Sequence, residues 1–253
     1  SGVSGSMYAS HTKLSHVMCI PVPGGIAAAD AASSFVNPLT ALGMTETMRL
    51  EGHSAIVHTA AASNLGQMLN RLCQADGIPL VNVVRRNEQA DLLRAAGADH
   101  VVVSSADSFA DDLTAAITAT GATLAFDAIG GGEQVDTLLA CMEKASSAGQ
   151  AFSRYGSDTH KQVYIYGGLD RSATTLRRTY GMSWSVGGWL LTPFLGRVGF
   201  ERMAELQARV AAEITTTFAS GYADTISLDD MLDPAVAKAY SAQATGEKRL
   251  VTP

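Results

Sequence analysis

Hydrophobic and polar positions follow two recurring patterns along this chain from residue 54 onward. Short apolar runs rich in β-branched residues predict buried strands. Between them, apolar residues recur at i, i+3, i+4 and i+7, which predicts helices with one apolar face. The predicted strands cover residues 54–59, 79–84, 101–103, 124–127 and 163–166. Strands that alternate with helices in this way are typical of a doubly wound parallel sheet, so we predict an α/β fold.

The helices predicted between these strands have apolar stripes at residues 65–72, 92–96, 109–117 and 135–142. Residues 145–160 are rich in Ser, Ala and Gly, and this composition predicts a surface loop. A less regular apolar segment follows at residues 184–194. The rest of the chain predicts a long helix from about Phe200 to Ala219, a short strand at residues 225–226, a helix from Asp229 to about Ala244 and a last strand at residues 249–251.

The segment between the first two strands has the features of a phosphate-binding turn. Its residues are mostly small, and alignment with the pattern G-x-G-x-x-G puts Ala61, Ser63 and Gly66 at the three glycine positions. A small residue at the second position lets the backbone approach a pyrophosphate, and the following helix supplies free N–H groups and a positive dipole. An ordinary alanine-rich turn has the same composition, so the turn alone leaves both interpretations open.

Two arginines end the second predicted strand. Sites that prefer NAD carry an acidic residue about 20 residues after the turn, where it binds the ribose 2′-hydroxyl. Arg85 and Arg86 occupy that place here, and the first acid is Glu88. A charge-assisted hydrogen bond to a 2′-phosphate contributes about 1.5–3 kcal/mol. The arginines therefore favour NADP(H) over NAD(H), and a solvated basic strand end is the structural alternative.

The composition narrows the possible functions. The chain has 253 residues, of which 47% are hydrophobic and 17% charged, as is ordinary for an enzyme with buried strands. A net charge of −6 argues against nucleic-acid or membrane-surface binding, so any phosphate site must be a local cluster of positive charge. No apolar run approaches the roughly 20 residues of a membrane span. We therefore expect a small-molecule substrate, no nucleic acid and no membrane.

Cysteine and histidine are scattered along the chain. The three cysteines are far apart, and there is neither a C-x-x-C motif nor a cluster of Cys and His. This pattern predicts no disulfide framework and no metal site, and it fits a reducing, cytoplasmic location. His53 and His58 lie around a predicted strand at positions that face opposite sides, which makes them poor partners for one metal ion.

Several motifs occur in an order that resembles one known family. In addition to the turn at residues 60–66, they are residues 35–44 (FVNPLTALGM), 97–101 (GADHV), 125–131 (AFDAIGG), 164–168 (YIYGG) and 246–251 (GEKRLV). Together they cover nearly the whole chain. They resemble the medium-chain dehydrogenase/reductase superfamily, on its quinone oxidoreductase and enoyl reductase side. The resemblance implies a Rossmann fold and, ahead of it, a GroES-like β-barrel domain.

The resemblance also implies a division of the chain. Residues 1–30 resemble a remnant of the GroES-like catalytic domain, residues 31–224 the NAD(P)-binding Rossmann domain, and residues 225–253 the segment that returns to the catalytic domain. The first Met is Met7, so residues 1–6 are either an added leader or part of a larger protein. We favour a fragment that lacks most of the barrel. A face that the barrel would cover favours self-association, so we expect a homo-oligomer, a dimer.

Carried over position by position, the resemblance assigns cofactor contacts to the ends of helices and strands. Asn37 and Thr40 would lie beside the nicotinamide, Ala62, Ser63, Asn64 and Leu65 along the pyrophosphate, Arg85 and Arg86 at the 2′-phosphate, Phe126 and Asp127 near the nicotinamide-side ribose, and Tyr166, Gly167 and Gly168 near the carboxamide. Structural alternatives are a helix cap for Asn37, core packing for Phe126 and a simple turn for the two glycines.

The resemblance implies an NADP-dependent enzyme that transfers a hydride from NADPH to a quinone or an α,β-unsaturated carbonyl compound. The group that polarises or protonates the substrate normally comes from the barrel. The chain contains no recognisable triad, carboxylate pair or activated cysteine, so the catalytic residues stay unknown. We expect this chain to bind NADP(H) without turning over substrate alone.

Other functions stay open at this point. The chain could be a non-catalytic NADPH-binding module, such as a sensor or scaffold, or part of a zinc-dependent alcohol dehydrogenase whose metal site lies in the missing domain. A short-chain reductase is disfavoured because the chain has no Tyr-x-x-x-Lys pair. A methyltransferase is disfavoured because it would carry an acid where Arg85 and Arg86 lie.

Overall fold

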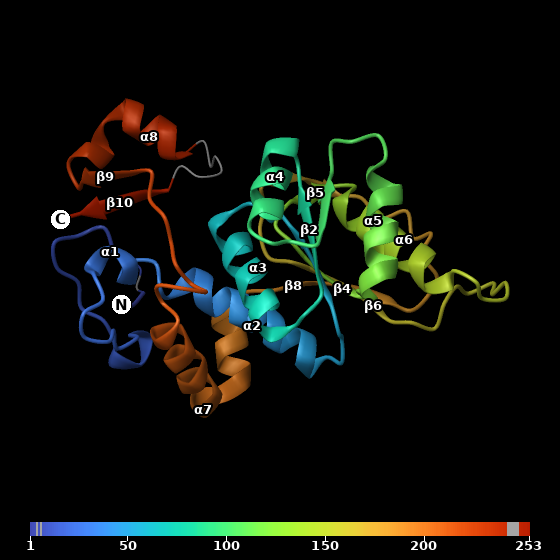
Figure 1. Ribbon diagram of the computed structural model, residues 1–253, viewed down its shortest axis with the longest axis horizontal. Coiled ribbons are helices and arrows are strands. Elements are labelled where there is room, and N and C mark those ends of the chain that lie inside the picture. The colour runs from blue at the N-terminus through green and yellow to red at the C-terminus, as the bar shows by residue number, and fades with distance from the viewer. Residues whose placement is uncertain (4, 6, 242–247) are drawn as a thin grey trace.

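A parallel sheet of six strands forms the centre of the computed structural model, which describes residues 1–3, 5, 7–241 and 248–253 (Figure 1). The strand order is β3-β2-β1-β4-β6-β8. The strands are β1 (Ile56–Thr59), β2 (Leu80–Val84), β3 (His100–Val103), β4 (Leu124–Asp127), β6 (Lys161–Ile165) and β8 (Trp184–Gly188). The strand order reverses between β1 and β4, so their carboxyl ends flank a switch point, the usual place for a ligand in such sheets. The predicted α/β fold is confirmed.

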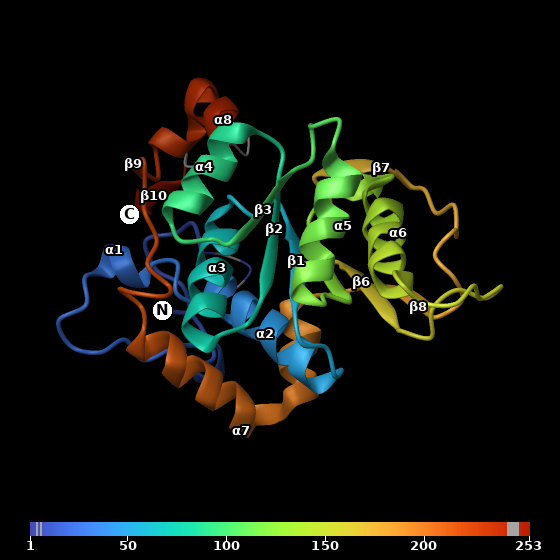
Figure 2. The same ribbon diagram turned by 45° about the vertical axis from the view of Figure 1, so that its right-hand side comes forward.

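Helices cover both faces of the sheet, with α3 and α4 on one side and α5 and α6 on the other (Figure 2). The long helices are α2 (Val36–Leu50), α3 (Asn64–Asp76), α4 (Asn87–Ala95), α5 (Phe109–Thr120), α6 (Gln134–Ser147) and α7 (Leu191–Ala212). Shorter elements are the 3₁₀ helices η1 (His16–Met18) and η2 (Asp230–Leu232), the helices α1 (Ala28–Ala31) and α8 (Pro234–Ser241), and the strands β5 (Gly130–Gly132), β7 (Asp170–Thr174), β9 (Asp224–Ser227) and β10 (Arg249–Thr252). No described helix is long and apolar enough to cross a membrane.

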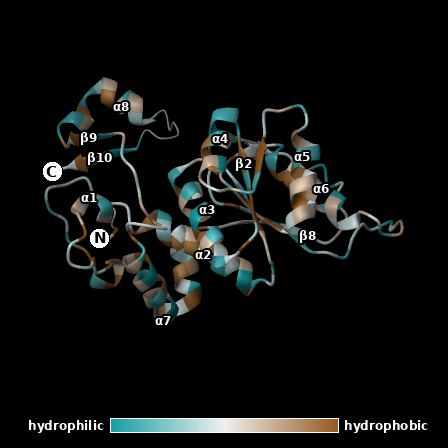
Figure 3. Ribbon diagram, in the orientation of Figure 1, coloured by the Kyte–Doolittle hydropathy of each residue, from teal (hydrophilic) through white to brown (hydrophobic). Residues whose placement is uncertain are grey.

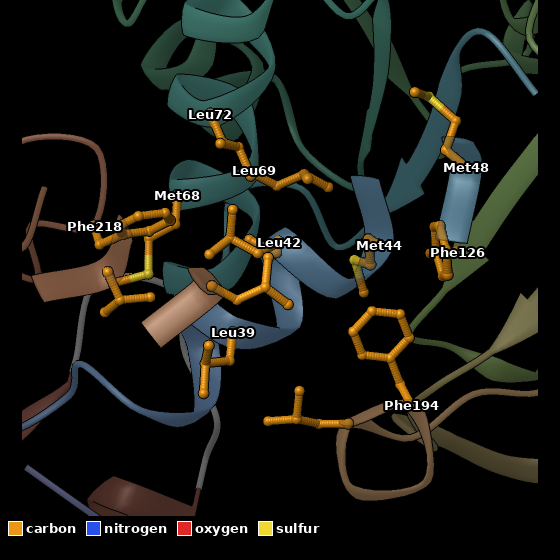
Figure 4. Close-up of a cluster of buried hydrophobic side chains, with 14 of the residues drawn as sticks. Leu39, Leu42, Met44, Met48, Met68, Leu69, Leu72, Phe126, Phe194 and Phe218 are labelled. Atoms are coloured by element: carbon orange, nitrogen blue, oxygen red, sulfur yellow. The ribbon is translucent and has the colours of Figure 1, made fainter. Parts of the chain in front are cut away.

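The larger hydrophobic core lies between the sheet and the helices α2, α3 and α7. Figure 4 shows Met44 of α2 beside Phe126 of β4 and Phe194 of α7, and Leu42 of α2 facing the side chains of α3. Residues 38–48 of α2 are all buried, so this helix is enclosed on every side. Each fully buried large apolar side chain contributes about 1.5–3 kcal/mol. The helix that carries Asn37 and Thr40 is therefore a rigid part of the core.

A second core lies on the opposite face, where α5 and α6 pack on the sheet. Val57 and Ala125 point to this side, whereas their neighbours Ile56 and Phe126 belong to the first core. This alternation follows from the two-residue period of a strand. Figure 3 shows hydrophobic residues concentrated in the central strands and hydrophilic residues on outer parts of α3 and α4. Strands buried on both faces explain why their sequences are continuous apolar runs.

Both ends of the described chain lie together, beside the sheet (Figures 1 and 2). The parallel pair β9 and β10 lies close to the N-terminal segment. The Tyr222 hydroxyl donates to the Ala29 carbonyl at 3.0 Å and lies 2.8 Å from the Ser33 hydroxyl. The two terminal segments therefore contact each other. Gly246 and Glu247 of the last motif, and residues 242–244 of the predicted helix, lie outside the described residues.

The structure differs from the predicted elements in the second half of the chain. Residues 184–188, predicted only as an irregular apolar segment, form the edge strand β8. The helix predicted from Phe200 begins earlier, at Leu191, contains a kink at Gly199 and ends at Ala212. The α6 helix runs three residues into the predicted loop, to Ser147.

Two further differences have local physical causes. The helix predicted from Asp229 is interrupted at Asp233, which has an extended backbone, because a residue before proline disfavours the helical conformation. The strand pair β5 and β7 was not predicted. One strand is three glycines and the other is fully exposed, so neither has the apolar pattern of a buried strand.

Candidate functional site

The predicted site residues that follow β1, β2, β4 and β6 lie at one edge of the sheet, because parallel strands end on the same side. Asn37 and Thr40 are separate from these strand ends, one helical turn apart near the start of α2. Neither of their side chains has a hydrogen-bond partner among the described residues, so both are available to a ligand. Asn37 is not the N-cap of α2, because Phe35 occupies that position.

The turn after β1 leads into α3 with a defined cap. The Ser63 hydroxyl accepts a hydrogen bond of 3.1 Å from the Gly66 N–H, and it keeps its own proton for a further partner. Ala60 has a φ of 51°, which is uncommon for a residue with a Cβ and marks a locally strained turn. The first N–H groups of α3, at Asn64 and Leu65, have no acceptor within the helix. Groups of this kind, at the positive end of a helix, are able to bind an anion.

Gly66 allows the turn and the helix to approach closely. A Cβ on this residue would lie 2.1 Å from the Ala61 carbonyl oxygen, a distance that no packed structure tolerates. Helix and strand therefore contact each other through the backbone. The sequence alignment of Gly66 with the third glycine of the nucleotide-binding pattern thus has a direct packing reason.

Sequence analysis assigned no role to Lys248, which lies near this turn. Its ammonium donates to the Ser220 hydroxyl at 2.9 Å, and that hydroxyl donates to the Asn64 side-chain carbonyl at 3.0 Å. The Asn64 amide nitrogen is buried and has no partner among the described residues. Burial lowers the pKa of Lys248 from 10.5 to about 8. A cation and an unpaired amide donor therefore adjoin the start of α3, a relation that no local pattern could reveal.

Arg85 and Arg86 are exposed at the end of β2, and their backbone is firmly held. Both backbone N–H groups donate to the Gln89 side chain at 3.1 Å, and the Ser105 hydroxyl donates to the Arg85 carbonyl at 2.7 Å. Within the described part of the chain neither guanidinium forms an ion pair. Most other arginines of the chain pair with carboxylates, so these two charges are free for a ligand.

Phe126 and Asp127 are fully buried at the end of β4. Phe126 belongs to the hydrophobic core, which is the alternative role that the sequence analysis gave it. The Asp127 carboxylate accepts hydrogen bonds from the Thr59 hydroxyl and from the N–H groups of Ile129 and Gly130. These side chains therefore shape the loop after β4. Their predicted place near a ribose stays a prediction, in which any contact would come from the backbone of that loop.

Tyr166 follows β6 and is bound to His58 of β1. The Tyr166 hydroxyl and His58 Nε2 are 2.7 Å apart, and the two rings are nearly parallel with centroids 5.7 Å apart. Burial lowers the pKa of His58 to about 3, so its imidazole is neutral. Burial, with the nearby charge of Asp127, raises the pKa of the Tyr166 phenol. No sequence pattern pairs these residues, because β4 separates the strand of His58 from the strand that Tyr166 follows.

Gly167 and Gly168 differ in their surroundings. A Cβ on Gly167 would lie 2.6 Å from the Ala128 carbonyl oxygen, so the loops after β4 and β6 pack against each other through this glycine. The Leu169 N–H also donates to the Ala128 carbonyl. Gly168 is exposed and meets nothing that would exclude a side chain. Gly167 thus has a structural reason, and the ligand contact predicted for both glycines stays a prediction.

Hollows elsewhere in the structure contain none of the predicted site residues. One of about 580 Å³ lies along the outer side of the edge strand β3, between α4 and α5. Another of about 520 Å³ lies between α2 and α7, lined by paired Arg and Glu side chains. Among the residues that the structure describes, no three His, Cys, Asp or Glu side chains are grouped as metal ligands would be.

Comparison with known proteins gives matches to one superfamily. The sequence model of the zinc-binding dehydrogenase family matches residues 65–151. The mitochondrial enoyl-[acyl-carrier-protein] reductase of Arabidopsis thaliana is 38% identical over 80 residues, which are 30% of this chain and 21% of that protein. The aligned part therefore spans about a fifth of the curated relative.

Solved structures match over most of the chain. A putative NADPH:quinone reductase from Mesorhizobium loti is 25% identical, with a TM-score of 0.76 over 93% of this chain and 64% of that one. The Escherichia coli quinone oxidoreductase complexed with NADPH is 18% identical, with a TM-score of 0.70 over 94% of this chain and 69% of that one. The family model covers residues 65–151, and with this fold and these relatives the chain is similar to the medium-chain dehydrogenase/reductase superfamily.

Proposed function

We propose that this chain binds NADPH along the carboxyl edge of the six-stranded sheet, as the cofactor domain of a reductase. The observation that carries the proposal is the pair of unpaired arginines at the end of β2, next to the open N-terminus of α3. The E. coli relative holds NADPH, and the M. loti relative is a putative NADPH:quinone reductase, which supports the same cofactor here. NADPH supplies a hydride from its nicotinamide ring when it is bound.

The start of α3 fits a pyrophosphate. The N–H groups of Asn64 and Leu65 and the Ser63 hydroxyl are free to donate, and the backbone at Ala62 has no bulky side chain in front of it. The buried Asn64 amide that lacks a partner would gain an acceptor, and the Lys248 ammonium would add a positive charge. These donors can bind a pyrophosphate without the help of a metal ion.

Arg85 and Arg86 would set the preference for NADPH over NADH. A 2′-phosphate offers oxygens to two guanidinium groups, whereas a free hydroxyl offers a single weak acceptor. A charge-assisted hydrogen bond contributes about 1.5–3 kcal/mol, and about 1.4 kcal/mol corresponds to a tenfold change in affinity. We therefore propose a preference of about tenfold to a hundredfold for NADPH.

The nicotinamide half of the site would be formed by residues that approach from two sides of the switch point. Tyr166 and the glycines after it lie at the end of β6, and Asn37 and Thr40 are unpaired on α2. These groups would orient the ring and exclude water from one side of it. The acceptor would be a quinone or an α,β-unsaturated carbonyl compound, because the relatives are a putative NADPH:quinone reductase and an enoyl-[acyl-carrier-protein] reductase.

We also propose that residues 1–30 and 225–253 belong with a second domain in the whole protein and that the chain self-associates as a dimer. Tyr222, which precedes the second segment by three residues, donates to the Ala29 carbonyl of the first segment, and this contact supports a common role for the two segments. Light scattering behind a sizing column measures the mass in solution. A strictly monomeric chain at micromolar concentration would contradict the dimer.

The test of the cofactor is a pair of titrations, with NADPH and with NADH. Arg85→Ala/Arg86→Ala should weaken NADPH binding by about tenfold or more and leave NADH binding nearly unchanged. A matched control is Arg94→Ala/Arg154→Ala, which removes the same charge from two exposed sites away from the strand end. Equal affinity of the wild-type chain for both cofactors, or the same loss in the control, would contradict the proposal.

Turnover is a separate measurement. NADPH oxidation is followed with quinones, enones and enoyl thioesters, for this chain and for any longer protein that contains it. Activity only in the longer protein would place the substrate-activating groups outside these residues, as we propose. Activity of the chain alone would assign those groups to the residues present here, and binding without turnover in both would favour a non-catalytic NADPH-binding module.

A further inference from the structure

We propose that His58 is a positioning residue that holds the Tyr166 ring across the switch point between β1 and β4, where the ring forms the floor of the nicotinamide half of the cofactor site. The inference rests on the proposed function and adds to it a residue with no predicted role. Its observations are the short contact between the two side chains, the full burial of His58 with the partial burial of Tyr166, and the position of their strands in the sheet.

The contact between His58 and Tyr166 spans the strand β4, as the order of the strands shows. In the strand order, β4 lies between β1 and β6, and neighbouring strands are about 4.8 Å apart. His58 pairs in register with Phe126 of β4, and Phe126 pairs with Tyr164 of β6. Tyr166 lies two residues farther along, so its side chain is on the same face and one step closer to the carboxyl edge. Its ring must cross β4 to reach His58.

The contact leaves few other positions for the Tyr166 ring. The His58 Nε2 and the Tyr166 hydroxyl are 2.7 Å apart, and the rings lie 17° from parallel. The Tyr166 backbone N–H donates to the Asp127 carbonyl, which holds the other end of the residue. The ring is therefore fixed at both ends, above the strand whose carboxyl end forms one side of the switch point. A fixed aromatic surface at this place suits a flat heteroaromatic ring.

His58 itself is enclosed by the protein. Its side chain is fully buried, and its Nδ1 has no hydrogen-bond partner among the described residues. A buried polar atom without a partner is costly, so a phenylalanine would be the simpler residue for packing alone. Among the described residues, the imidazole is hydrogen-bonded to Tyr166 alone. Positioning of that hydroxyl is thus the role that the contacts of His58 support.

The experiment compares two ligands that share the adenosine half. NADPH reaches the nicotinamide half, whereas 2′,5′-ADP occupies only the adenosine end, so the pair separates the two halves of the site. In His58→Phe, the affinity for NADPH should fall by about tenfold, and that for 2′,5′-ADP should stay within about twofold. His58→Gln, which keeps a side-chain amide able to bond the phenol, should recover most of the NADPH affinity. Calorimetry or NADPH fluorescence measures each dissociation constant.

Tyr166→Phe tests the same bond from its other side and covers the case in which His58→Phe does not fold. It should lower the affinity for NADPH and not that for 2′,5′-ADP, and the double variant should be no weaker than the weaker single variant. Unchanged NADPH affinity in Tyr166→Phe and in a folded His58→Phe, or an equal loss for both ligands, would overturn the inference. A wild-type chain that binds neither ligand would instead overturn the proposed function, and the inference with it.

Discussion

The hydroxyl of Thr59 donates a hydrogen bond of 2.7 Å to the carboxylate of Asp127, and it accepts one of 2.8 Å from the Ala128 N–H. Both side chains are buried. Because Asp127 also accepts from the loop that follows it, this pair fastens the end of β1 to the loop after β4. The side chains of Thr59 and Asp127 therefore join the two sides of the switch point, one residue past the last residues that β1 and β4 pair in register.

Thr59→Val should lower the stability of the chain, although valine and threonine have nearly the same shape. It leaves the buried Ala128 N–H without its acceptor, at about 1–3 kcal/mol, and it removes one of the two hydrogen bonds that Asp127 Oδ1 accepts. The free energy of unfolding in urea measures the loss. The matched control is Thr118→Val on the exposed side of α5, where the hydroxyl bonds only a helix carbonyl and the change should stay within about 0.5 kcal/mol. Equal losses at both sites would contradict a special role for Thr59.

Gly66→Ala and Gly196→Ala should have opposite effects on stability. A Cβ at residue 66 would lie 2.1 Å from the Ala61 carbonyl oxygen, so the turn or the helix must move, at a cost of about 1–3 kcal/mol or more. Residue 196 lies within α7, and a Cβ there meets nothing within 4 Å. Alanine should stabilise that helix by up to about 1 kcal/mol. Denaturant unfolding measures both, and a neutral Gly66→Ala would show that the turn is not closely packed.

Ser63 should accept a glycine and reject a large side chain. Glycine at a helix N-cap costs only a few tenths of a kcal/mol relative to serine, and Ser63→Gly should keep NADPH binding within about threefold. Ser63→Leu removes the acceptor of the Gly66 N–H and puts a branched side chain where we place the pyrophosphate. It should abolish NADPH binding while circular dichroism still shows the fold. Normal binding by a folded Ser63→Leu would move the pyrophosphate away from this turn.

The affinity for NADPH should fall as the pH rises above about 8. Burial lowers the pKa of Lys248 to about 8, so its ammonium loses its proton there, and with it the charge that we assign to the pyrophosphate. A bound anion raises the pKa of Lys248 in the complex, so the affinity falls between a pH of about 8 and that higher pKa. Lys248→Met should bind NADPH more weakly at pH 7 and should lack this fall. The same pH profile in both proteins would exclude Lys248 as its source.

The stability of the chain without cofactor tests the lowered pKa of Lys248 independently, because that pKa determines the direction in which stability changes with pH. The pKa of Lys248 is about 8 when folded and 10.5 when unfolded, so the unfolded chain binds more protons between these values. Stability from this residue therefore rises with pH across that window. Urea unfolding of the wild type at several pH values, compared with Lys248→Met, isolates the contribution. A difference between the two proteins that does not change with pH would contradict the lowered pKa.

Much of the sheet could be predicted because local patterns determine its strands. The predicted strand at residues 124–127 has the bounds of β4, and those at residues 54–59 and 79–84 contain β1 and β2. Ser63 and Gly66 were correctly placed at the start of a helix, where their roles depend on neighbours only a few residues away. The edge strand β8 and the β5–β7 pair lacked such a pattern, because partners distant in the sequence stabilise them.

The sequence by itself determined the alternating strands and helices, the tight turn of small residues before α3 and the basic end of β2, because each depends on residue types within one turn or one strand. Only the tertiary structure decided that Asp127 is bound by Thr59, that His58 meets Tyr166 across β4 and that Lys248 reaches Asn64 through Ser220. Those contacts join residues far apart in the chain. Burial and strand order bring them together, and no local pattern encodes either.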